Sequence, residues 1–526
     1  MKQNQYISRR NLLHTAALTA AGLSANKNAT ATTQDVTNTN GLQRLGIGSA
    51  QRQGEPYELA GKRIVFTNWY YVRPGSFGYF DAKGNKIPLD GYAGLLDAQM
   101  RQFDAPSGIC LQAYRPLSKR SDIDIYTIIQ DGPKYRLWGD GYQESTDFVN
   151  WAQQPTKGGP NGTVFIDPSA PPQERYKAVG LRDATEEEFR AFIKNRPDDF
   201  QRLAVDADPG RVHAIFGSVS ADGINWRQLP VPISVEHSDT NIVAYYDKSL
   251  KKYVMYTRNY PLGPRSEKIP YKGFRDQWAV GRRSIGRSET DDFRHFPVSE
   301  VISEPNPDMS PTDMLYTNCR TTIPAAPDHH LMFPTIWHRD TDTTSIGFMS
   351  SHNGKLWNYI SGSPLFRTTE FGKWDGGCIF AYVNLIELPN GSFALPYHGY
   401  NVPHKYPRKL RKRATGLLLW PKGRLVALEA RGQGAFTTVA FVPPGRKLKI
   451  NAVTERVTEI RVEVVAYHNN KPISGRTFND CLPIVGDNHW TTVTWKGGND
   501  LECNNGTAIV LRFKMNKAKI FGLEFA

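Results

Sequence analysis

The sequence has 526 residues, of which 65 are Lys or Arg and 51 are Asp or Glu, so its formal net charge is +14. This length exceeds what one hydrophobic core usually organises, and 5 Cys are too few for a disulfide-stapled fold. The positive charge favours polyanionic partners. Because no nucleic-acid-binding motif is present in the sequence, nucleic acid is a poor candidate among them.

The N-terminal residues predict export. Arg9 and Arg10 form a twin-arginine pair before a short, mildly apolar stretch that ends in small residues. We therefore expect a twin-arginine signal peptide over residues 1–25 and a disordered lead-in over residues 26–50. No later stretch of the sequence is as apolar as a membrane helix, so we expect a periplasmic or secreted protein without a membrane anchor.

A pattern of strand, turn and strand then recurs five times. Each unit opens with an apolar strand, turns at Asp, Gly or Asn, and returns as a second strand. Most units close on a corner of the type Ser-x-x-Gly-x-x-Trp. The five units cover residues 123–151, 162–226, 239–296, 316–357 and 374–398. This repetition predicts four-stranded blades around an axis, and we expect a five-bladed β-propeller with an N-terminal extension over residues 51–423. A two-sheet sandwich would not explain the ordered repetition of the corner.

Two further segments complete the expected architecture. Thr185 followed by Glu188 is a capping box, which predicts a short helix inserted between two strands and ending near Lys194. Residues 424–526 alternate with period two between Gly and Asn turns, which indicates a jelly-roll-like β-sandwich. The expected fold class is therefore all-β, a five-bladed β-propeller followed by a C-terminal jelly-roll-like β-sandwich.

Three stretches carry a resemblance to a known group of proteins. They are residues 163–177 (TVFIDPSAPPQERYK), 286–293 (GRSETDDF) and 480–487 (DCLPIVGD). With the order of the two expected domains, they resemble the five-bladed propeller clan of glycoside hydrolase families 32 and 43, and more closely secreted bacterial proteins described as family-32-like glycosyl hydrolases. The resemblance runs from about Phe103 to the C-terminus. The invertase-type Asn-Asp-Pro-Asn and Glu-Cys motifs are absent from the sequence, so fructosidase activity is not implied.

The clan pattern implies carboxylates from several blades around the mouth of the tunnel. Cleavage of a glycosidic bond needs one protonated carboxyl and one ionised carboxylate. The acids at the starts of the expected inner strands are Asp124, Glu236, Asp239 and Asp375. Asp239 is the foremost catalytic candidate, and Glu236 is a candidate general acid because apolar neighbours would raise its pKa. The alternative for each is an acid that simply caps a turn.

Other polar residues near the expected strand starts are candidate sugar or anion contacts. They are Asp313, Tyr316, Arg320, His338, His398 and His404. Histidines of this kind also serve as structural residues. The basic run over residues 405–413 is expected to be a solvated loop, or to contact sulfate or carboxylate groups if it borders the pocket. Cys and His spacings give no metal site.

Taken together, these patterns favour an exported glycoside hydrolase that cleaves an oligo- or polysaccharide, including an acidic or sulfated one. We expect no cofactor, although the clan allows a calcium ion in the tunnel, and no nucleic-acid partner. One alternative is a lyase or dehydratase acting by elimination on uronate-containing glycans, since positive charge and His, Tyr and Arg candidates also suit that reaction. A second alternative is a propeller that binds glycan without catalysis.

Overall fold

The period-two pattern of the sequence gives strands through much of the described chain. The computed structural model describes residues 54–87, 99–160, 162–206, 210–261, 263, 266, 268 and 281–526. The predicted signal peptide and most of the lead-in lie outside these residues. The protein is all-β, and residues Glu55–Ala526 form one compact unit. Within the described ranges, no helix has both the length and the apolar character that a membrane span requires.

The first three sequence repeats each fold into one antiparallel four-stranded sheet in chain order. The strands of the first are β8 (Thr127–Asp131), β9 (Lys134–Gly139), β10 (Gly141–Ser145) and β11 (Ala152–Gln154). Those of the second are β12 (Thr163–Ile166), β13 (Tyr176–Ala184), β14 (Val212–Ser220) and β15 (Arg227–Gln228). Those of the third are β16 (Val243–Asp247), β17 (Lys252–Asn259), β18 (Ser284–Thr290) and β19 (Glu300–Ser303).

The fourth repeat differs, because its strands are divided between two four-stranded sheets. One contains β20 (Asp313–Leu315), β23 (Thr335–His338), β24 (Thr343–Ile346) and β27 (Phe366–Arg367). The other contains β21 (Arg320–Ile323), β22 (Ala326–Met332), β25 (Met349–Ser351) and β26 (Asn358–Tyr359). Pro334 separates β22 from β23 and has no backbone N–H to continue a ladder. Opposite it, a Cβ on Gly347 would come within 3.1 Å of the Pro334 ring, so the two residues mark one break.

The fifth repeat is completed by a strand that precedes the first. Its sheet contains β28 (Cys378–Ala381), β30 (Phe393–Tyr400), β31 (Arg413–Trp420) and β7 (Leu117–Ser121), with β29 (Ile386–Glu387) paired to β30. Strand β7 pairs antiparallel with β31, with Leu117 opposite Leu419 and Ser121 opposite Thr415. The start and the end of the repeat region are therefore joined within one sheet.

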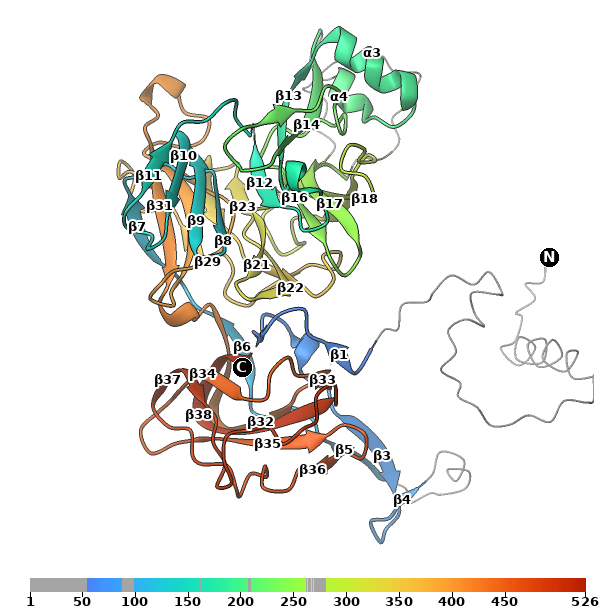
Figure 1. Cartoon of the computed structure of the whole chain (residues 1–526), viewed down its shortest axis with the longest axis vertical. Coiled ribbons are helices and arrows are strands. Elements are labelled where there is room, and N and C mark those ends of the chain that lie inside the picture. Colours follow the sequence, from blue (N-terminus) through green and yellow to red (C-terminus); the bar gives the residue numbers. More distant parts are fainter. Residues whose placement is uncertain are drawn as a thin grey trace, which may run out of the picture. The chain divides into compact units, whose positions relative to one another are not determined.

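The C-terminal region forms a ten-stranded sheet around the long strand β38 (Ile509–Phe525). The other strands from this region are β32 (Val426–Thr437), β33 (Phe441–Val442), β34 (Leu448–Thr454), β35 (Ile460–Ala466), β36 (Lys471–Pro472) and β37 (Asp487–Thr492). Three strands come from the N-terminal extension: β1 (Tyr57–Glu58), β2 (Arg63–Ile64) and β6 (Cys110–Ala113). Figure 1 shows blue β1 and β6 among the red and orange C-terminal strands. The sequence pattern instead predicts that this N-terminal extension belongs to the propeller over residues 51–423.

The remaining elements are short. A three-stranded sheet consists of β3 (Ser76–Phe80), β4 (Lys86–Ile87) and β5 (Gln99–Phe103). The α-helices are α3 (Glu186–Asn195) and α4 (Arg202–Asp206), and 3-10 turns cover η1 (Trp69–Tyr71), η3 (Pro172–Glu174), η5 (Arg408–Leu410) and η6 (Pro421–Gly423). The predicted capping box is confirmed, because the Thr185 hydroxyl accepts from Glu188 N and the Glu188 carboxylate accepts from Thr185 N.

The Ser-to-Trp corners share one set of hydrogen bonds. In the second repeat, the Ser220 hydroxyl accepts from the N–H of Gly223 at 2.9 Å, and Asp222 Oδ1 accepts from the next two N–H groups. The same contacts recur at Ser145 and at Ser351. The Asp or Asn side chains of these corners, Asp147, Asp222 and Asn353, accept from backbone N–H groups, as expected of turn residues.

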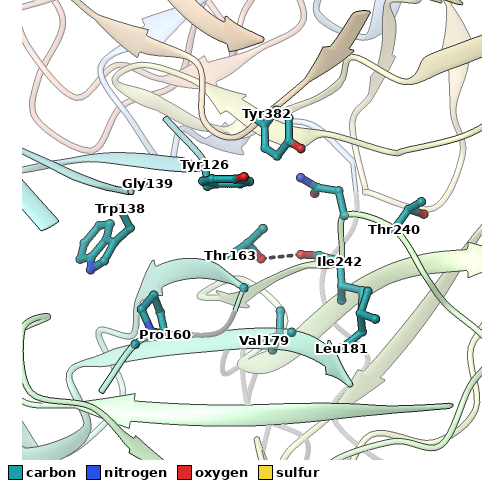
Figure 2. A pocket seen from close by; sticks show the side chains of 14 residues that line it. Tyr126, Trp138, Gly139, Pro160, Thr163, Val179, Leu181, Thr240, Ile242 and Tyr382 are labelled. Atoms are coloured by element: carbon teal, nitrogen blue, oxygen red, sulfur yellow. Dashed lines mark hydrogen bonds between the residues drawn. The ribbon is translucent and has the colours of Figure 1, made fainter. Parts of the chain in front are cut away.

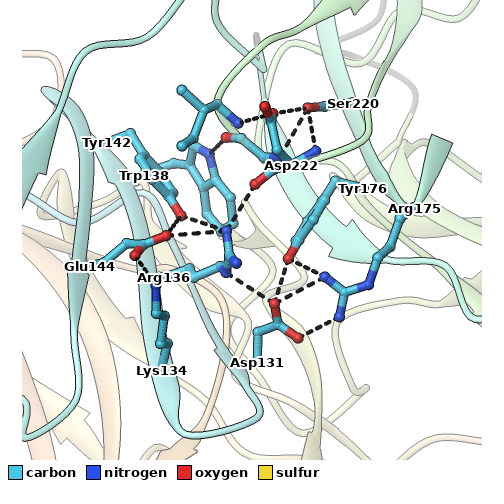
Figure 3. Close-up of polar contacts among 12 residues, drawn as sticks. Asp131, Lys134, Arg136, Trp138, Tyr142, Glu144, Arg175, Tyr176, Ser220 and Asp222 are labelled. Carbon is cyan, nitrogen blue, oxygen red and sulfur yellow. Dashed lines mark hydrogen bonds and ion pairs between the residues drawn. The ribbon is translucent and has the colours of Figure 1, made fainter. Parts of the chain in front are cut away.

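Neighbouring sheets are also joined by buried polar contacts. Figure 3 shows Asp131, at the end of β8, accepting from both Arg175 and Tyr176 of the second sheet. Arg136 of β9 donates at 2.8 Å to the backbone oxygen of Asp222, and the Trp138 indole donates at 2.9 Å to that of Gly223. These contacts fix the first sheet against the second, and the pocket described next lies partly between the two.

Candidate functional site

A pocket with a volume of about 490 Å³ opens where the first, second, third and fifth repeat sheets meet. Its walls include the rings of Tyr126, Trp138 and Tyr382 and the side chains of Thr163 and Thr240 (Figure 2). The Tyr126 and Tyr382 rings are 5.4 Å apart and perpendicular. Its volume and its mixture of aromatic surface and a few polar groups are typical of small-ligand sites.

Asp124 lies directly behind this wall, two residues before Tyr126. Its carboxylate accepts from the Thr415 hydroxyl at 2.8 Å and from Arg413 at 2.8 Å, and the His398 imidazole lies 3.1 Å away. Burial opposes its ionisation, but hydrogen bonds from His398 and Thr415 and the charge of Arg413 lower the pKa of Asp124 to about 2. The carboxylate is therefore ionised at neutral pH.

The backbone at Asp124 is held by a close approach from β9. A Cβ at position 139 would lie 2.0 Å from the carbonyl oxygen of Asp124, so only Gly139 fits there. Gly139 itself lines the pocket. The same close packing thus shapes the pocket wall and positions the carboxylate.

Asp239 lies on the opposite side, immediately before the pocket residue Thr240. It forms ion pairs with Arg258 of β17 and Arg283, which precedes β18. The side chains of both arginines are only 2% exposed, whereas that of Asp239 is 43% exposed. Despite the cost of burial, Arg283 and Arg258 hold the pKa of Asp239 well below its usual value. Asp239 is thus an ionised, accessible carboxylate that two buried arginines hold in place.

A second polar pair, Tyr316 and His404, lies beside the ion pairs of Asp239. The Tyr316 ring lies under the Arg283 guanidinium at 3.8 Å, and its hydroxyl is hydrogen bonded to His404 Nε2 at 2.9 Å. Thr240 also donates at 3.0 Å to the Tyr316 carbonyl. Burial and the nearby charges of Lys405, Arg411 and Arg283 lower the pKa of His404 to about 3, so its imidazole is neutral. Two candidate contacts, Tyr316 and His404, therefore lie beside the Asp239 cluster.

Glu236, expected at the mouth, is not among the residues that line this pocket. It is 1% exposed, and its carboxylate accepts from Ser234 at 2.9 Å, from Ser299 N at 3.1 Å and from Thr257 at 3.3 Å. Desolvation raises the pKa of Glu236, as expected from its apolar neighbours. A general acid must reach the leaving oxygen, and no atom of this enclosed side chain reaches the pocket wall.

Asp375 is likewise buried, at 2% exposure, in the loop that precedes β28 of the fifth repeat sheet. Its carboxylate accepts from the Tyr397 hydroxyl at 2.9 Å and from the Thr369 hydroxyl. Its neighbour Gly399 has no space for a side chain, since a Cβ there would lie 2.6 Å from the Asp375 Cβ. Asp375 therefore holds a loop to its own sheet, and the structure does not bring it to the pocket.

Three other expected contacts are also internal. Asp313 and His338 pair at 2.7 Å between β20 and β23, and the other ring nitrogen of His338 meets Ser345 at 2.9 Å. Arg320 is buried against His330 at 2.7 Å and the Tyr245 ring at 3.3 Å. In the described residues, none of the three lines the pocket.

His398 is fully buried behind the aromatic wall. Its ring lies 4.2 Å from that of Tyr382 and 5.0 Å from that of Tyr126. Desolvation lowers the pKa of His398, so the imidazole beside Asp124 is neutral. It supports Asp124 and two pocket rings, and does not itself contact a ligand in the pocket.

The structure also brings in residues that sequence patterns missed. Arg258 and Arg283 hold Asp239, while Tyr126, Trp138 and Tyr382 form the pocket walls. The aromatic residues had no signal beyond the strand pattern, because buried Tyr and Trp are common in sheets. Within the described ranges, no group of three or more His, Cys, Asp or Glu side chains is arranged to hold a metal ion. The sequence-based option of a calcium ion is not tested by this observation.

Comparison with protein-family models gave no match, and neither did comparison with curated proteins. Solved structures do match. A thermostable family-43 glycoside hydrolase is 12% identical, covers 59% of this chain and 95% of its own, and has a TM-score of 0.34. The family-32 β-fructofuranosidase of Bombyx mori is 10% identical over 79% of this chain and 93% of its own, with a TM-score of 0.33.

A third match is an N-acetylgalactosamine deacetylase from F. plautii, solved with blood group B trisaccharide. It is 12% identical, covers 69% of this chain and 95% of its own, and has a TM-score of 0.34. The matched structures include members of glycoside hydrolase families 32 and 43. Likeness at this level does not by itself assign a reaction or a substrate to this chain.

Proposed function

We propose that the protein is a glycoside hydrolase that cleaves an oligo- or polysaccharide at this pocket. The observation that carries the proposal is the pair Asp124 and Asp239, two ionised carboxylates next to the pocket residues Tyr126 and Thr240. The pocket has aromatic walls at Tyr126, Trp138 and Tyr382, and aromatic faces suit the apolar faces of sugar rings. Hydrolysis of a glycosidic bond needs an ionised carboxylate, which activates water or stabilises the cationic transition state, together with a protonated group that donates to the leaving oxygen.

The two carboxylates have different surroundings and therefore different proposed roles. Asp239 is accessible and fixed by two buried arginines, which suits a base that activates water or a charge that stabilises a cationic transition state. Asp124 is less exposed, at 17%, and receives a Thr415 hydroxyl and the Arg413 guanidinium, which suits a carboxylate that orients substrate or shares the charge-stabilising role. The Tyr316 hydroxyl, paired with neutral His404, is a protonated group at the same corner.

The sheets support a propeller for this proposal. We interpret the repeat sheets as five blades, with the divided fourth repeat as one blade bent at Pro334 and the fifth closed by β7. The ten-stranded C-terminal sheet would then be the jelly-roll-like sandwich, extended by β1, β2 and β6. In a propeller the innermost strands line the central tunnel, and Asp124 and Asp239 both lie just before such strands.

The experiment is a screen of the purified protein against a panel of plant and algal glycans. New reducing ends from wild type, with loss of the signal when Asp124 and Asp239 are both replaced by Asn, would support hydrolysis. Binding of a glycan without turnover on any member of the panel would favour a non-catalytic propeller instead.

A second candidate reaction is elimination on a uronate-containing glycan. One observation favours it: both pocket carboxylates are ionised, while neutral His404 and the Tyr316 hydroxyl lie beside Arg283. Elimination needs a base such as His or Tyr and a cation that neutralises the sugar carboxylate. Unsaturated products that absorb in the ultraviolet would distinguish this reaction from hydrolysis.

We also propose export by the twin-arginine route, on the basis of Arg9 and Arg10 before an apolar stretch. Replacing both by Lys should leave the uncleaved precursor in the cytoplasm. Unchanged export of that variant would contradict the assignment.

A further inference from the structure

The loop between β30 and β31 concentrates positive charge beside the pocket. It carries six cations in nine residues: Lys405, Arg408, Lys409, Arg411, Lys412 and Arg413. The chain has no Asp or Glu between residues 388 and 428 to compensate for them locally. All of these side chains except Arg411, which is half-buried, belong to exposed residues. We refer to residues 404–413 as the basic loop.

The two ends of the basic loop contact the two sides of the site. At its start, His404 is hydrogen bonded to Tyr316, which lies under the Arg283 that pairs with Asp239. At its end, Arg413 forms a 2.8 Å ion pair with Asp124, and its guanidinium donates to the hydroxyl of the pocket residue Tyr126. The two ends of the loop therefore connect to the two proposed carboxylates, directly at Asp124 and through Tyr316 and Arg283 at Asp239.

The cations in the middle of the basic loop form no ion pairs with carboxylates among the described residues. Of its six cations, Arg413 alone forms a carboxylate ion pair among the described residues, with Asp124 and Asp140. Arg411 instead packs over the Tyr400 ring at 3.7 Å, and its Nε has no hydrogen-bond partner in the described structure. The start of the loop is fixed by Asp342, whose oxygens accept from the N–H groups of His404 at 3.1 Å and of Lys405 at 2.6 Å.

Concentrated unpaired charge has an electrostatic cost unless a ligand neutralises it. Like charges on neighbouring residues repel each other, while a row of Arg and Lys side chains presents strong donors to carboxylate and sulfate groups. Arginine in particular binds such planar or tetrahedral anions through two parallel hydrogen bonds.

We infer that the basic loop binds the anionic groups of the glycan, sulfate esters or uronate carboxylates, on sugar units that extend out of the pocket. The inference rests on the proposed function and names its substrate class, an acidic glycan. Arg408, Lys409 and Lys412 in the middle of the loop make these contacts, while Arg413 keeps its place on Asp124.

The test is binding by wild type and by the triple variant Arg408→Glu, Lys409→Glu, Lys412→Glu. Titration calorimetry would use three oligosaccharides of equal length: an oligogalacturonate, a sulfated carrageenan fragment and a neutral xylo-oligosaccharide. The matched control is Lys447→Glu, Lys471→Glu, Lys496→Glu, which changes the net charge equally on exposed residues of the C-terminal region. Thermal melting checks that both variants fold.

We expect wild type to bind at least one anionic oligosaccharide about tenfold or more tightly than the neutral one at low salt, and added salt to reduce that preference. The loop variant should lose the preference, and the control variant should keep it. The anionic ligand that responds identifies sulfate or carboxylate. Equal affinity of wild type for all three ligands, or equal loss in both variants, would overturn the inference.

The outcomes also separate this inference from the proposed function. Anionic binding lost in the loop variant, without turnover of any glycan, would contradict hydrolysis and leave the basic loop as an anion-binding surface. Turnover of neutral glycans that is unchanged in the loop variant, with no anion preference, would support hydrolysis and contradict the inference.

Discussion

Four acids at expected strand starts have two different fates, although the sequence presents them alike. Asp124 and Asp239 lie two residues and one residue before the pocket-lining residues Tyr126 and Thr240, and both form ion pairs with arginines. Glu236 and Asp375 are buried in loops that precede β16 and β28, and their partners are hydroxyl and backbone N–H groups. The four acids therefore differ in their partners and not in their positions relative to a strand. Acids paired with arginine are candidates for ligand binding, whereas acids bound by hydroxyl and N–H groups have a structural role.

The electrostatic consequences of the two kinds of partner are opposite. Each acid bears a desolvation cost, but Arg283 and Arg258 keep the pKa of Asp239 low, and hydrogen bonds from His398 and Thr415 with the charge of Arg413 lower that of Asp124. Burial raises the pKa of Glu236, because its neutral donors do not offset the loss of water. A charged partner keeps a carboxylate ionised and therefore able to act in a reaction. Neutral donors hold the side chain in place whether or not its carboxyl group is ionised.

Removing the charge of a pocket acid should have the largest effect. Asp239→Asn and Asp124→Asn should each lower turnover of a cleaved glycan by about 100-fold or more, since both charges are proposed to act in the reaction. Initial rates over a substrate series would separate kcat from KM. Asp247→Asn is the matched control, because Asp247 caps a turn by accepting from the N–H groups of Ser249 and Leu250.

The arginine pairing adds a stability effect for Asp239. Asn leaves Arg258 and Arg283 buried without their shared carboxylate, so the melting temperature of that variant should fall as well. Rates must therefore be compared well below the melting temperature. Near-normal turnover of both variants under those conditions would remove Asp124 and Asp239 from the proposed reaction.

Glu236 should show the reverse pattern, with loss of stability and little loss of chemistry. Glu236→Ala removes the acceptor of several buried donors and should cost about 3 kcal/mol or more of unfolding free energy. Glu236→Gln keeps one oxygen and the shape, so it should restore most of that stability. Denaturant unfolding measures both. A Gln variant that folds normally but has lost turnover would return Glu236 to a catalytic role.

The pH dependence tests how Arg413 acts on Asp124. Hydrogen bonds from His398 and Thr415 and the Arg413 charge lower the pKa of Asp124 to about 2, so the ionised form should persist as the pH falls well below 4. Arg413→Met removes one of the groups that favour the ion. The pKa should rise towards its ordinary value, moving the acidic limb of kcat/KM to higher pH by up to about one unit.

The same shift has a defined effect on stability. A depressed carboxylate pKa stabilises the folded state above the ordinary pKa, and this contribution is lost as the pH falls towards 2. Arg413→Met should therefore reduce stability at neutral pH and make the acid transition less steep. An unchanged acidic limb in this variant would mean that Asp124 is not the group that titrates in the reaction.

The smallest effect is expected at Asp375. Asp375→Asn retains an oxygen that accepts from one of the two hydroxyls, of Tyr397 and Thr369, and the other hydroxyl can rotate. We expect a loss of about 1 kcal/mol in thermal or denaturant unfolding and turnover within about twofold of wild type. A large loss of turnover without unfolding would place Asp375 with the pocket acids.

Local patterns predicted local structure well. The two residues of the capping box, Thr185 and Glu188, are three positions apart. The Ser-to-Trp corners likewise form their hydrogen bonds within one turn. The fates of Glu236 and Asp239 could not be predicted in this way, although they are only three positions apart. Their partners Ser299 and Arg283 lie just before β19 and β18, more than forty residues further along the chain, so the distinction exists only in the folded protein.

The strand β7 has a consequence for how the chain folds. Its partner β31 ends at Trp420, so the last repeat sheet cannot be completed until nearly three hundred residues between them are present and ordered. The strands β1 and β2 likewise wait for β33 and β38. Closing a loop of this length costs conformational entropy before the new contacts compensate for it, so we expect slow refolding. We also expect both ends of the chain to unfold in the same transition.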